Sequence, residues 1–366
     1  MRSARSSPAP SPDGVPGSPF LTTRLHLRAP FLVFLADINA HVYAKTGLGL
    51  AQWCPDRCLA QLRLPGCGVD AGLPEMDVRT AARAGARSLI LGVAPIGGKI
   101  EESWMETMRQ AAREGLDVVA GMHSSLASVP GLAAAAALGQ ARLVDVRIPP
   151  SGIPIGTGRK RSGMRLLTVG TDCAVGKKYS ALAITQELRR RGLKATFRAT
   201  GQTGIMIAGA GIPIDAVVCD FAAGAAEVLS PDNDPDHWDV IEGQGSLFHP
   251  AYAGVSLSLL HGSQPDAIVA CLEAKRRTHT GCPDYPLPDI LECIDLHLRV
   301  GRRTNPGLRC AGVSVNTMRL AAAERLAWLG ELSQLTGLPC GDPLVDGLGP
   351  IVDELTAAWG PGDAAR

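Results

Sequence analysis

Nine residues near the middle of the chain have the composition of a phosphate-binding loop. They lie between an apolar run, 166–169, and a helical pattern that begins at Ser180, and they read Gly170, Thr171, Asp172, Cys173, Ala174, Val175, Gly176, Lys177 and Lys178. Glycines let backbone N–H groups close around an anion, a helix N-terminus adds partial positive charge, and a lysine adds a full charge. The segment therefore predicts binding of a phosphorylated ligand.

The loop departs from the common pattern at two points. Five residues, rather than four, separate Gly170 from Gly176. Lys178 follows the loop lysine, where a Ser or Thr commonly helps to hold Mg²⁺. Cys173 is interpreted as a small residue that fits a tight turn, although helix-end charge could also activate a thiol there. The loop is suited to holding phosphates and less suited to phosphoryl transfer.

Two polar clusters follow other expected strands, at the sheet edge where open α/β proteins bind ligands. Arg198, Gln202 and Thr203 follow a strand expected at 195–199, and their guanidinium, amide and hydroxyl groups can grip a carboxylate or phosphate. Glu242 ends an apolar strand and is followed by Gly-Gln-Gly. A carboxylate in that place can hold a metal, take a proton or bind an amine.

Four further residues are candidates on weaker grounds. His249 follows the Glu242 cluster and could line the same site. Gln244 could donate a hydrogen bond there. Asn316 ends an expected strand and could either bind a nucleobase or cap the next helix, whereas Lys45 lies in a polar turn that could face a junction between domains.

The elements that must position these residues alternate between strand and helix, which indicates an α/β fold with parallel sheets. We predict an N-terminal Rossmann-like domain at 30–148, a Pro/Gly-rich linker at 149–164 and a P-loop domain at 165–366. Residues 1–29 are expected to be a disordered extension. Strands of the second domain after its loop are expected at 195–199, 216–219, 238–241, 267–271, 296–300 and 310–315.

Composition limits the function classes. The chain has 366 residues, 46% apolar and 19% charged, which suits two globular domains. A net charge of +1 gives no basis for binding nucleic acid or an anionic membrane, and no apolar run approaches the roughly 20 residues of a membrane span. The ten cysteines show no disulfide or metal-pair spacing, so we expect free thiols in the cytoplasm and no metal site.

The motifs together resemble known proteins. The loop at 170–177 with the Glu-Gly-Gln-Gly at 242–245 resembles the dethiobiotin synthetase type of P-loop protein. The chain from about Pro30 is more similar to a bacterial and archaeal family of D-glutamate N-acetyltransferases, formerly a family of unknown function. The strings that carry this resemblance are Arg63–Cys67, Gly170–Lys177, Arg198–Gly204, Asp234–Asp239, Ile241–Pro250 and Leu260–Asp266. Residues 36–43 and the N-terminal extension depart from it.

The resemblance implies a Rossmann-like domain followed by a P-loop domain, and transfer of an acetyl group from acetyl-CoA to the α-amino group of D-glutamate or a related acidic amino acid. The loop at 170–178 would then hold CoA phosphates, with Asn316 beside the cofactor. The acidic substrate would be held by Arg198, Gln202, Thr203, Gln244 and Lys45. Glu242 is the first candidate for the general base, and His249 is the second.

Two other readings remain open. An ATP-dependent ligase or carboxylase of the dethiobiotin synthetase type would need Mg²⁺, with Asp172 and Glu242 as ligands and Ser180 or Thr203 in place of the missing hydroxyl. A nucleotide-binding regulator would carry no chemistry of its own. We expect a homodimer, by analogy with proteins of this type.

Overall fold

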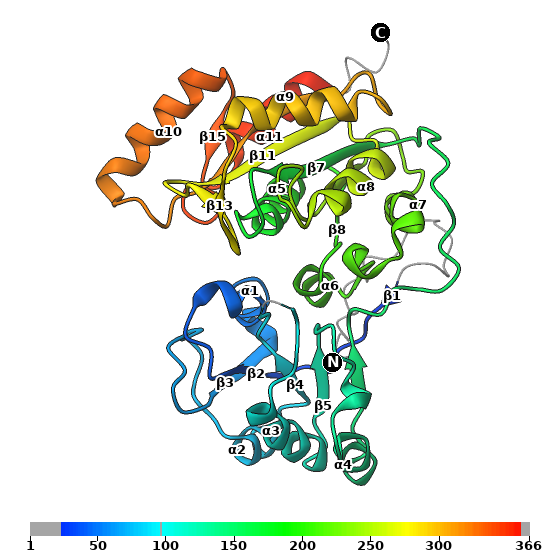
Figure 1. The fold of residues 1–366 in the computed structure, drawn as a ribbon, viewed down its shortest axis with the longest axis vertical. Helices are drawn as coiled ribbons and strands as arrows, with labels where there is room; N and C mark the ends of the chain where they lie inside the picture. The colour runs from blue at the N-terminus through cyan, green and yellow to red at the C-terminus, as the bar shows by residue number, and fades with distance from the viewer. Residues whose placement is uncertain (1–22, 96, 360–366) are drawn as a thin grey trace, which may run out of the picture.

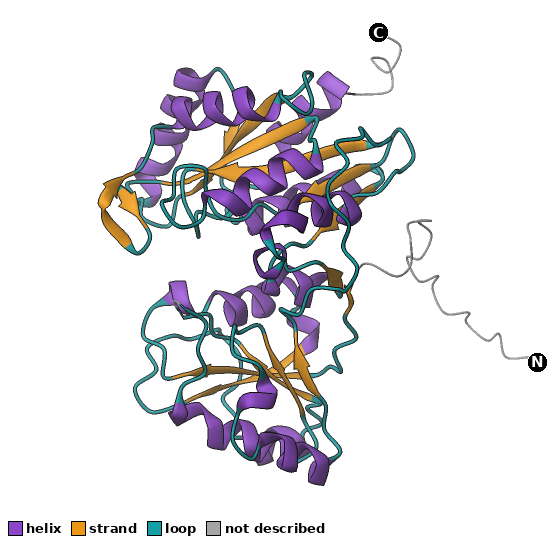
Figure 2. Ribbon diagram, turned by 45° about the vertical axis from the view of Figure 1, so that its right-hand side comes forward, coloured by secondary structure: helices purple, strands orange, loops and turns teal. Residues whose placement is uncertain are grey.

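The computed structural model describes residues 23–95 and 97–359, which form two α/β units (Figures 1 and 2). Each unit contains a parallel sheet, which confirms the predicted fold class. Most of the expected N-terminal extension, residues 1–22, lies outside the described residues. Among the described helices, none combines the length and apolar character that crossing a bilayer requires.

The N-terminal sheet has five parallel strands in the order β3-β2-β4-β5-β6. They are β2 (Phe31–Ala36), β3 (Cys58–Arg63), β4 (Ser88–Leu91), β5 (Asp117–Ala120) and β6 (Leu143–Asp145). All six residues of β2 are buried, as expected for a strand covered on both faces. Strand β3 lies on one side of β2 and β4 lies on the other, so the chain connections change direction at β2. Open sheets of this kind bind ligands beyond the carboxyl ends of the strands at that point.

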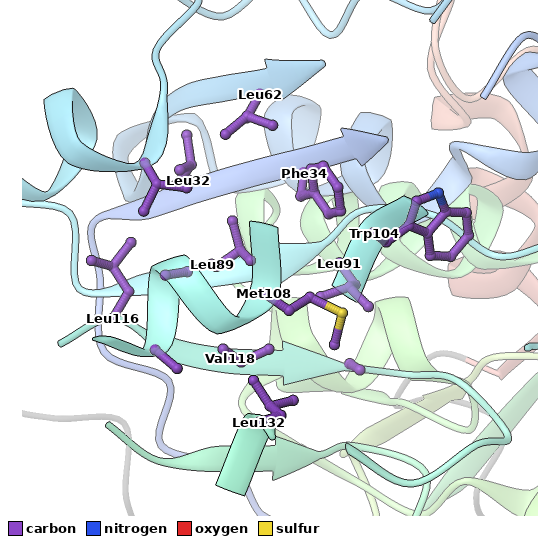
Figure 3. Packing of buried hydrophobic residues seen from close by; sticks show 14 of the residues in the cluster. Leu32, Phe34, Leu62, Leu89, Leu91, Trp104, Met108, Leu116, Val118 and Leu132 are labelled. Atoms are coloured by element: carbon purple, nitrogen blue, oxygen red, sulfur yellow. The ribbon is translucent and has the colours of Figure 1, made fainter. Parts of the chain in front are cut away.

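One face of this sheet is covered by three helices of the same unit (Figure 3). They are α2 (Val78–Arg83), α3 (Glu102–Arg113) and α4 (Leu132–Gly139). Alternate residues of the strands, including Leu32, Phe34 and Leu89, point into this core, where they meet Trp104 and Met108 of α3. The period of two along each strand sends the intervening residues to the opposite face.

The opposite face is completed by the other unit. Phe31, Val33 and Ile90 form one buried cluster with Ile205 and Met206. The last two residues belong to α6 (Gln202–Ala208), which follows a strand of the C-terminal sheet and packs beside α1 (Lys45–Trp53) between the two units (Figure 1). The two domains therefore share a hydrophobic core.

The C-terminal sheet has six parallel strands in the order β15-β14-β11-β7-β10-β8. They are β7 (Met164–Gly170), β8 (Ala195–Arg198), β10 (Trp238–Ile241), β11 (Ala267–Glu273), β14 (Arg309–Asn316) and β15 (Cys340–Gly341). The helices of this unit besides α6 are α5 (Lys177–Arg190), α7 (Cys219–Leu229), α8 (Ala253–Ser263), α9 (Ile290–Gly301), α10 (Ala322–Thr336) and α11 (Gly349–Trp359). The central strand β7 leads into the predicted loop, with β10 and β11 on its two sides.

Two short antiparallel pairs complete the fold. Strand β1 (Thr23–Arg24) pairs with β9 (Ala210–Gly211), and β12 (Thr278–His279) pairs with β13 (Cys282–Pro286). The first pair corrects the expected extension at 1–29, since its last residues are part of the fold. Leu27 is buried in the shared core, and Arg28 pairs with the buried Asp117.

The segment expected as a linker lies against the C-terminal unit. Its Arg161 is buried and donates to the carbonyl oxygens of Ser230, Gly262 and Ser263 at 2.7, 2.8 and 3.1 Å. The backbone N–H of Thr157 donates to Glu227 Oε1 at 2.8 Å. The segment is thus held along α7 and the end of α8.

Two strands expected in the second domain are wrong. Residues 216–219 end a short 3-10 helix and begin α7, and residues 296–300 lie inside α9. The alternation Leu-His-Leu-Arg-Val imitates a strand, but the residues that α9 buries are Ile290, Cys293, His297 and Gly301, which follow the helical period. Asp289 caps this helix by accepting from the N–H of Glu292 at 2.8 Å.

Candidate active site

The phosphate loop is wound between β7 and α5. Gly176 has φ of 112° and Ala174 has φ of 54°, so the chain turns through the left-handed region twice before the helix begins. A Cβ on Gly170 would lie 2.6 Å from the carbonyl oxygen of Cys271 on β11, which explains the glycine at the strand end. The strand, turn and helix that the sequence predicted are confirmed.

Two polar groups in the loop are placed for an anion. Lys177 Nζ donates to the carbonyl oxygen of Asp172 at 2.6 Å, so its ammonium lies across the loop. The hydroxyl of Thr171 is buried and has no hydrogen-bond partner among the described residues. A buried hydroxyl without a partner costs free energy, which a ligand oxygen would recover.

The Asp172 carboxylate is saturated by donors from the segment after β11. Its Oδ2 accepts from Arg276 Nη1 at 2.9 Å and from the N–H and hydroxyl of Thr280, both at 2.8 Å. Its Oδ1 accepts from His279 Nδ1 at 2.9 Å. Burial alone would raise the pKa of Asp172, but these hydrogen bonds outweigh it and lower the pKa. The ionised side chain fastens the β12–β13 hairpin to the phosphate loop.

Asp172, His249 and His279 are buried, and one ligand atom of each lies within 4.8 Å of the others. This set has the residue types of a transition-metal site. However, His249 Nε2 lies 3.1 Å from the carbonyl oxygen of Thr280, and since a carbonyl only accepts, that nitrogen carries a proton. A metal would have to replace this bond and the His279 bond, while Arg276 already neutralises Asp172. The geometry favours a hydrogen-bonded clamp over a metal centre.

The same bonds bear on the predicted role of His249 as a base. Its Nδ1 accepts from the N–H of Ala251 at 3.1 Å, while Nε2 donates to the carbonyl of Thr280. Both ring nitrogens are therefore engaged with the backbone, and no lone pair is left to take a proton from a substrate. His249 packs edge-to-face against His279, with 5.2 Å between ring centroids, so it supports the clamp.

Glu242 follows β10 and is buried beside the start of α6. Its Oε2 accepts from the N–H groups of Thr200 and Gly201 at 3.0 and 3.2 Å, whereas Oε1 has no hydrogen bond among the described residues. A Cβ on Gly204 would clash with this carboxylate, so the glycine admits it. Burial raises the pKa of Glu242 above its ordinary value, against the opposing effects of the Thr200 bond and the nearby Lys178. A carboxylate with a free oxygen and a raised pKa can act as a general base.

Cations from both domains meet next to Glu242. Lys178 Nζ lies 3.5 Å from the carbonyl oxygen of Lys45, across the junction between the units. Desolvation by the surrounding protein lowers the pKa of Lys45, and the Lys178 charge lowers it further. Burial lowers the pKa of Lys178 to about 8, although Glu242 opposes this shift. Among the described residues, neither lysine forms an ion pair within 4.0 Å.

Three of the predicted substrate-binding residues gather at this junction, and a fourth lies next to them. Thr203 Oγ1 lies 2.9 Å from Thr46 Oγ1, and Gln202 Nε2 donates to the same hydroxyl at 3.4 Å, so both residues adjoin Lys45. Gln202 Oε1 is buried without a partner in the described part of the chain, against Gly121 at the end of β5. Gln244 Nε2 donates to Thr200 Oγ1 at 3.0 Å, next to the backbone groups that hold Glu242.

The structure directs three other predicted residues elsewhere. Arg198 Nε donates to the buried Asp239 at 2.8 Å, so an internal carboxylate pairs its charge, while its buried Nη2 has no hydrogen-bond partner among the described residues. Asn316 Oδ1 accepts from the N–H of Met318 at 3.1 Å, and Ala321, not Asn316, occupies the N-cap of α10. Burial raises the pKa of the Cys173 thiol, which disfavours a nucleophilic thiolate and agrees with a small turn residue.

Sequence reasoning missed the residues that support the site. Arg276, His279 and Thr280 make the contacts described above, yet none stands in a glycine-rich motif after a strand. A usable signal was the polar run Lys275-Arg276-Arg277-Thr278-His279-Thr280, which directly follows the apolar strand that neighbours the loop strand. Thr46 stands in the same polar turn as Lys45, which the sequence suggested could face the junction between the domains, although no contact was predicted for its hydroxyl.

Known proteins resemble this chain over nearly its whole length. It is 48% identical over 331 residues to a protein of Tritonibacter scottomollicae named D-glutamate N-acetyltransferase, covering 90% of this chain and 99% of that one. A Pseudoalteromonas protein of the same name is 42% identical over 332 residues, covering 90% and 100%. The crystal structure of a DUF1611 family protein from Anabaena variabilis superimposes with a TM-score of 0.82 at 31% identity, covering 90% of this chain and 100% of that one.

The two halves match two family descriptions. Residues 62–149 match the DUF1611_N Rossmann-like domain, and residues 154–352 match the DUF1611_C P-loop domain, both described as domains of unknown function. The predicted resemblance is therefore confirmed. The chain belongs to the DUF1611 family, together with the proteins named D-glutamate N-acetyltransferase.

Proposed function

We propose that this protein transfers an acetyl group from acetyl-CoA to the α-amino group of D-glutamate. The observation that carries the proposal is the convergence of Lys45, Lys177 and Lys178 on one glycine loop without carboxylate partners among the described residues. Unpaired cations in a protein junction call for anionic ligands. Acetyl-CoA carries several phosphate charges and D-glutamate carries two carboxylates, and the relatives that span the chain are named D-glutamate N-acetyltransferase.

The loop suits the phosphate groups of CoA. Backbone N–H groups of residues 170–176, the N-terminus of α5 and the Lys177 ammonium would bind the pyrophosphate. The unpartnered Thr171 hydroxyl supports this assignment, since a phosphate oxygen would satisfy it.

The junction on the other side of Glu242 suits the amino acid. Lys45 would pair with a carboxylate of D-glutamate, while Gln202 and Thr203 would donate or accept hydrogen bonds beside it. The buried Gln202 Oε1, which has no partner among the described residues, could accept from the substrate ammonium. Arg198 is left out of this set because Asp239 holds it.

Glu242 would act as the general base. When bound, acetyl-CoA supplies a thioester whose acetyl carbon bonds to the amine nitrogen as the C–S bond breaks, giving the amide, free CoA thiol and one proton. The amine must first lose a proton, which Glu242 Oε1 can accept while Oε2 stays fixed by Thr200 and Gly201. Loop N–H groups, or the second N–H of Gln244, would stabilise negative charge on the carbonyl oxygen.

The ligase reading finds less support. It assigns Asp172 to Mg²⁺, but all four donors described above already occupy that carboxylate. We also propose that the protein is a cytoplasmic homodimer, and size-exclusion chromatography with light scattering would test the oligomeric state.

The direct test is turnover. Purified protein with acetyl-CoA should form N-acetyl-D-glutamate by mass spectrometry, faster than with L-glutamate, and ATP with Mg²⁺ should not be consumed. Glu242→Gln should lower kcat by about 10²–10⁴-fold, the usual contribution of a general base. Glu331→Gln, on the exposed face of α10, serves as the matched control. No acetylated product from D-glutamate would refute the function, and full turnover by Glu242→Gln would refute the base.

A further inference from the structure

Lys178 stands at the position where phosphate loops usually place the hydroxyl that binds Mg²⁺. A metal-binding loop also needs an acid from a neighbouring strand, and Glu242 after β10 occupies that place. The question is whether other hydroxyls or acids of this chain could rebuild a magnesium site around these two residues.

The candidate replacements are all engaged elsewhere. Ser180 donates to the carbonyl oxygen of Gly176 at 3.1 Å and lies 2.7 Å from Ser314 Oγ. Thr203 contacts Thr46, and Asp172 is saturated by the hairpin. Phosphate loops usually hold Mg²⁺ with a hydroxyl and an acid beside phosphate and water, and here no hydroxyl of the described residues near the loop is left free to join Glu242 except that of Thr171.

The Lys178 side chain, in contrast, is held in place from both domains. Its Nζ lies 4.4 Å from the centre of the Tyr179 ring, and that ring stacks on Trp53 of α1 at 6.3 Å. The carbonyl oxygen of Lys45 lies 3.5 Å from Nζ on the other side. Gly49 of α1 leaves room for this ammonium, because a Cβ there would lie 2.9 Å from it.

The surrounding charges leave Lys178 able to bind a further anion. Lys45, Lys177 and Arg147 are the cations of this junction, and Glu242 is the acid that acts on Lys178. Arg147 is paired with Asp215. The Lys178 ammonium and Glu242 form no ion pair within 4.0 Å among the described residues, so the positive charge is available to a ligand.

We propose that the Lys178 ammonium takes the electrostatic place of Mg²⁺, so that the loop binds the phosphate groups of the acyl donor without a metal ion. The inference rests on the proposed function for the identity of that donor. It also explains how Glu242 stays free of a metal and keeps an oxygen for proton transfer.

The test is binding of free CoA, measured by isothermal titration calorimetry with EDTA and again with Mg²⁺. The wild-type protein should bind with the same affinity in both buffers. Loss of binding in EDTA that Mg²⁺ restores would overturn the proposal, even if turnover with D-glutamate is intact. Metal-independent CoA binding without turnover would instead leave this proposal standing and refute the proposed function.

Variants make the test specific to Lys178. Lys178→Met should weaken CoA binding at least about tenfold, the lower range for a charge-assisted hydrogen bond, with an unchanged thermal midpoint. Lys178→Arg should recover part of the affinity. The matched control is Lys194→Met. Lys194 directly precedes β8, at the amino-terminal ends of the strands and away from the loop, and it pairs with Asp234 and Asp236. Wild-type affinity in folded Lys178→Met would overturn the proposal.

Discussion

Individual side chains of the site divide into those that hold the loop and those that remain available to ligands. Asp172 belongs to the first group: it is a loop residue, yet the hydrogen bonds of its carboxylate run to the hairpin segment 276–280. Lys178 and Glu242 Oε1 belong to the second. The position of a residue in a motif thus does not reveal its role, since Asp172 and Lys178 stand in the same loop.

Asp172→Asn should destabilise the protein by about 1–3 kcal/mol, because an N–H donor would replace an acceptor oxygen that faces donors of segment 276–280, while Arg276 keeps its pair with Glu273. Urea unfolding followed by tryptophan fluorescence measures this. Asp284→Asn, at an exposed hairpin position, is the control. An effect as small as that of the control would contradict the clamp.

The pH dependence of the free energy of unfolding should also change in the Asp172→Asn variant. The folded pKa of Asp172 is lowered, so its stabilisation is present above the unfolded value near 4 and is lost as pH falls through the folded value. Asp172→Asn should therefore lose part of the acid-dependent fall in unfolding free energy that the wild type shows.

At the scale of elements, the sequence predicted those that are marked by a continuous apolar run or by a glycine-rich motif. The buried strands, the loop and helix α5 could be placed, since continuous apolar runs and glycine punctuation mark them. Residues 296–300 could not, because five residues of alternation mimic a strand until the longer period of α9 is counted. The sequence could only suggest that Lys45 lies near Gln202. The two residues belong to different domains, and no local pattern shows which surfaces of the domains meet.

Helix α6 is the element that joins the two units, and this leads to a prediction. Met206 is fully buried in the shared cluster, so Met206→Ala should cost about 2–5 kcal/mol of unfolding free energy. Because the cavity opens between the sheet of one unit and a helix of the other, we expect a single earlier transition in urea. Two separated transitions in the variant would show that the units unfold independently.

Across the whole molecule, the site is assembled from two domains that each lack a part of it. The loop and Glu242 come from the C-terminal unit, whereas Lys45 and Thr46 come from α1 of the N-terminal unit. Sequence reasoning placed the domains in order along the chain and suggested that Lys45 could face their junction, but it did not predict a shared hydrophobic core. Their shared core is a long-range property, since β1 pairs with β9, α1 packs against α6, and Phe31 and Met206 belong to one buried cluster.

This sharing predicts how fragments behave. A fragment of residues 23–148 would expose the surface of α1 that packs against α6, and a fragment of residues 149–359 would expose Ile205 and Met206. Exposed apolar surface of this kind promotes aggregation, so each fragment alone should bind the dye ANS and precipitate. Co-expression should yield a soluble complex, because docking α6 buries both surfaces again. Soluble, ANS-silent fragments with cooperative unfolding would show that the two domains fold independently and that α6 contributes little to holding them together.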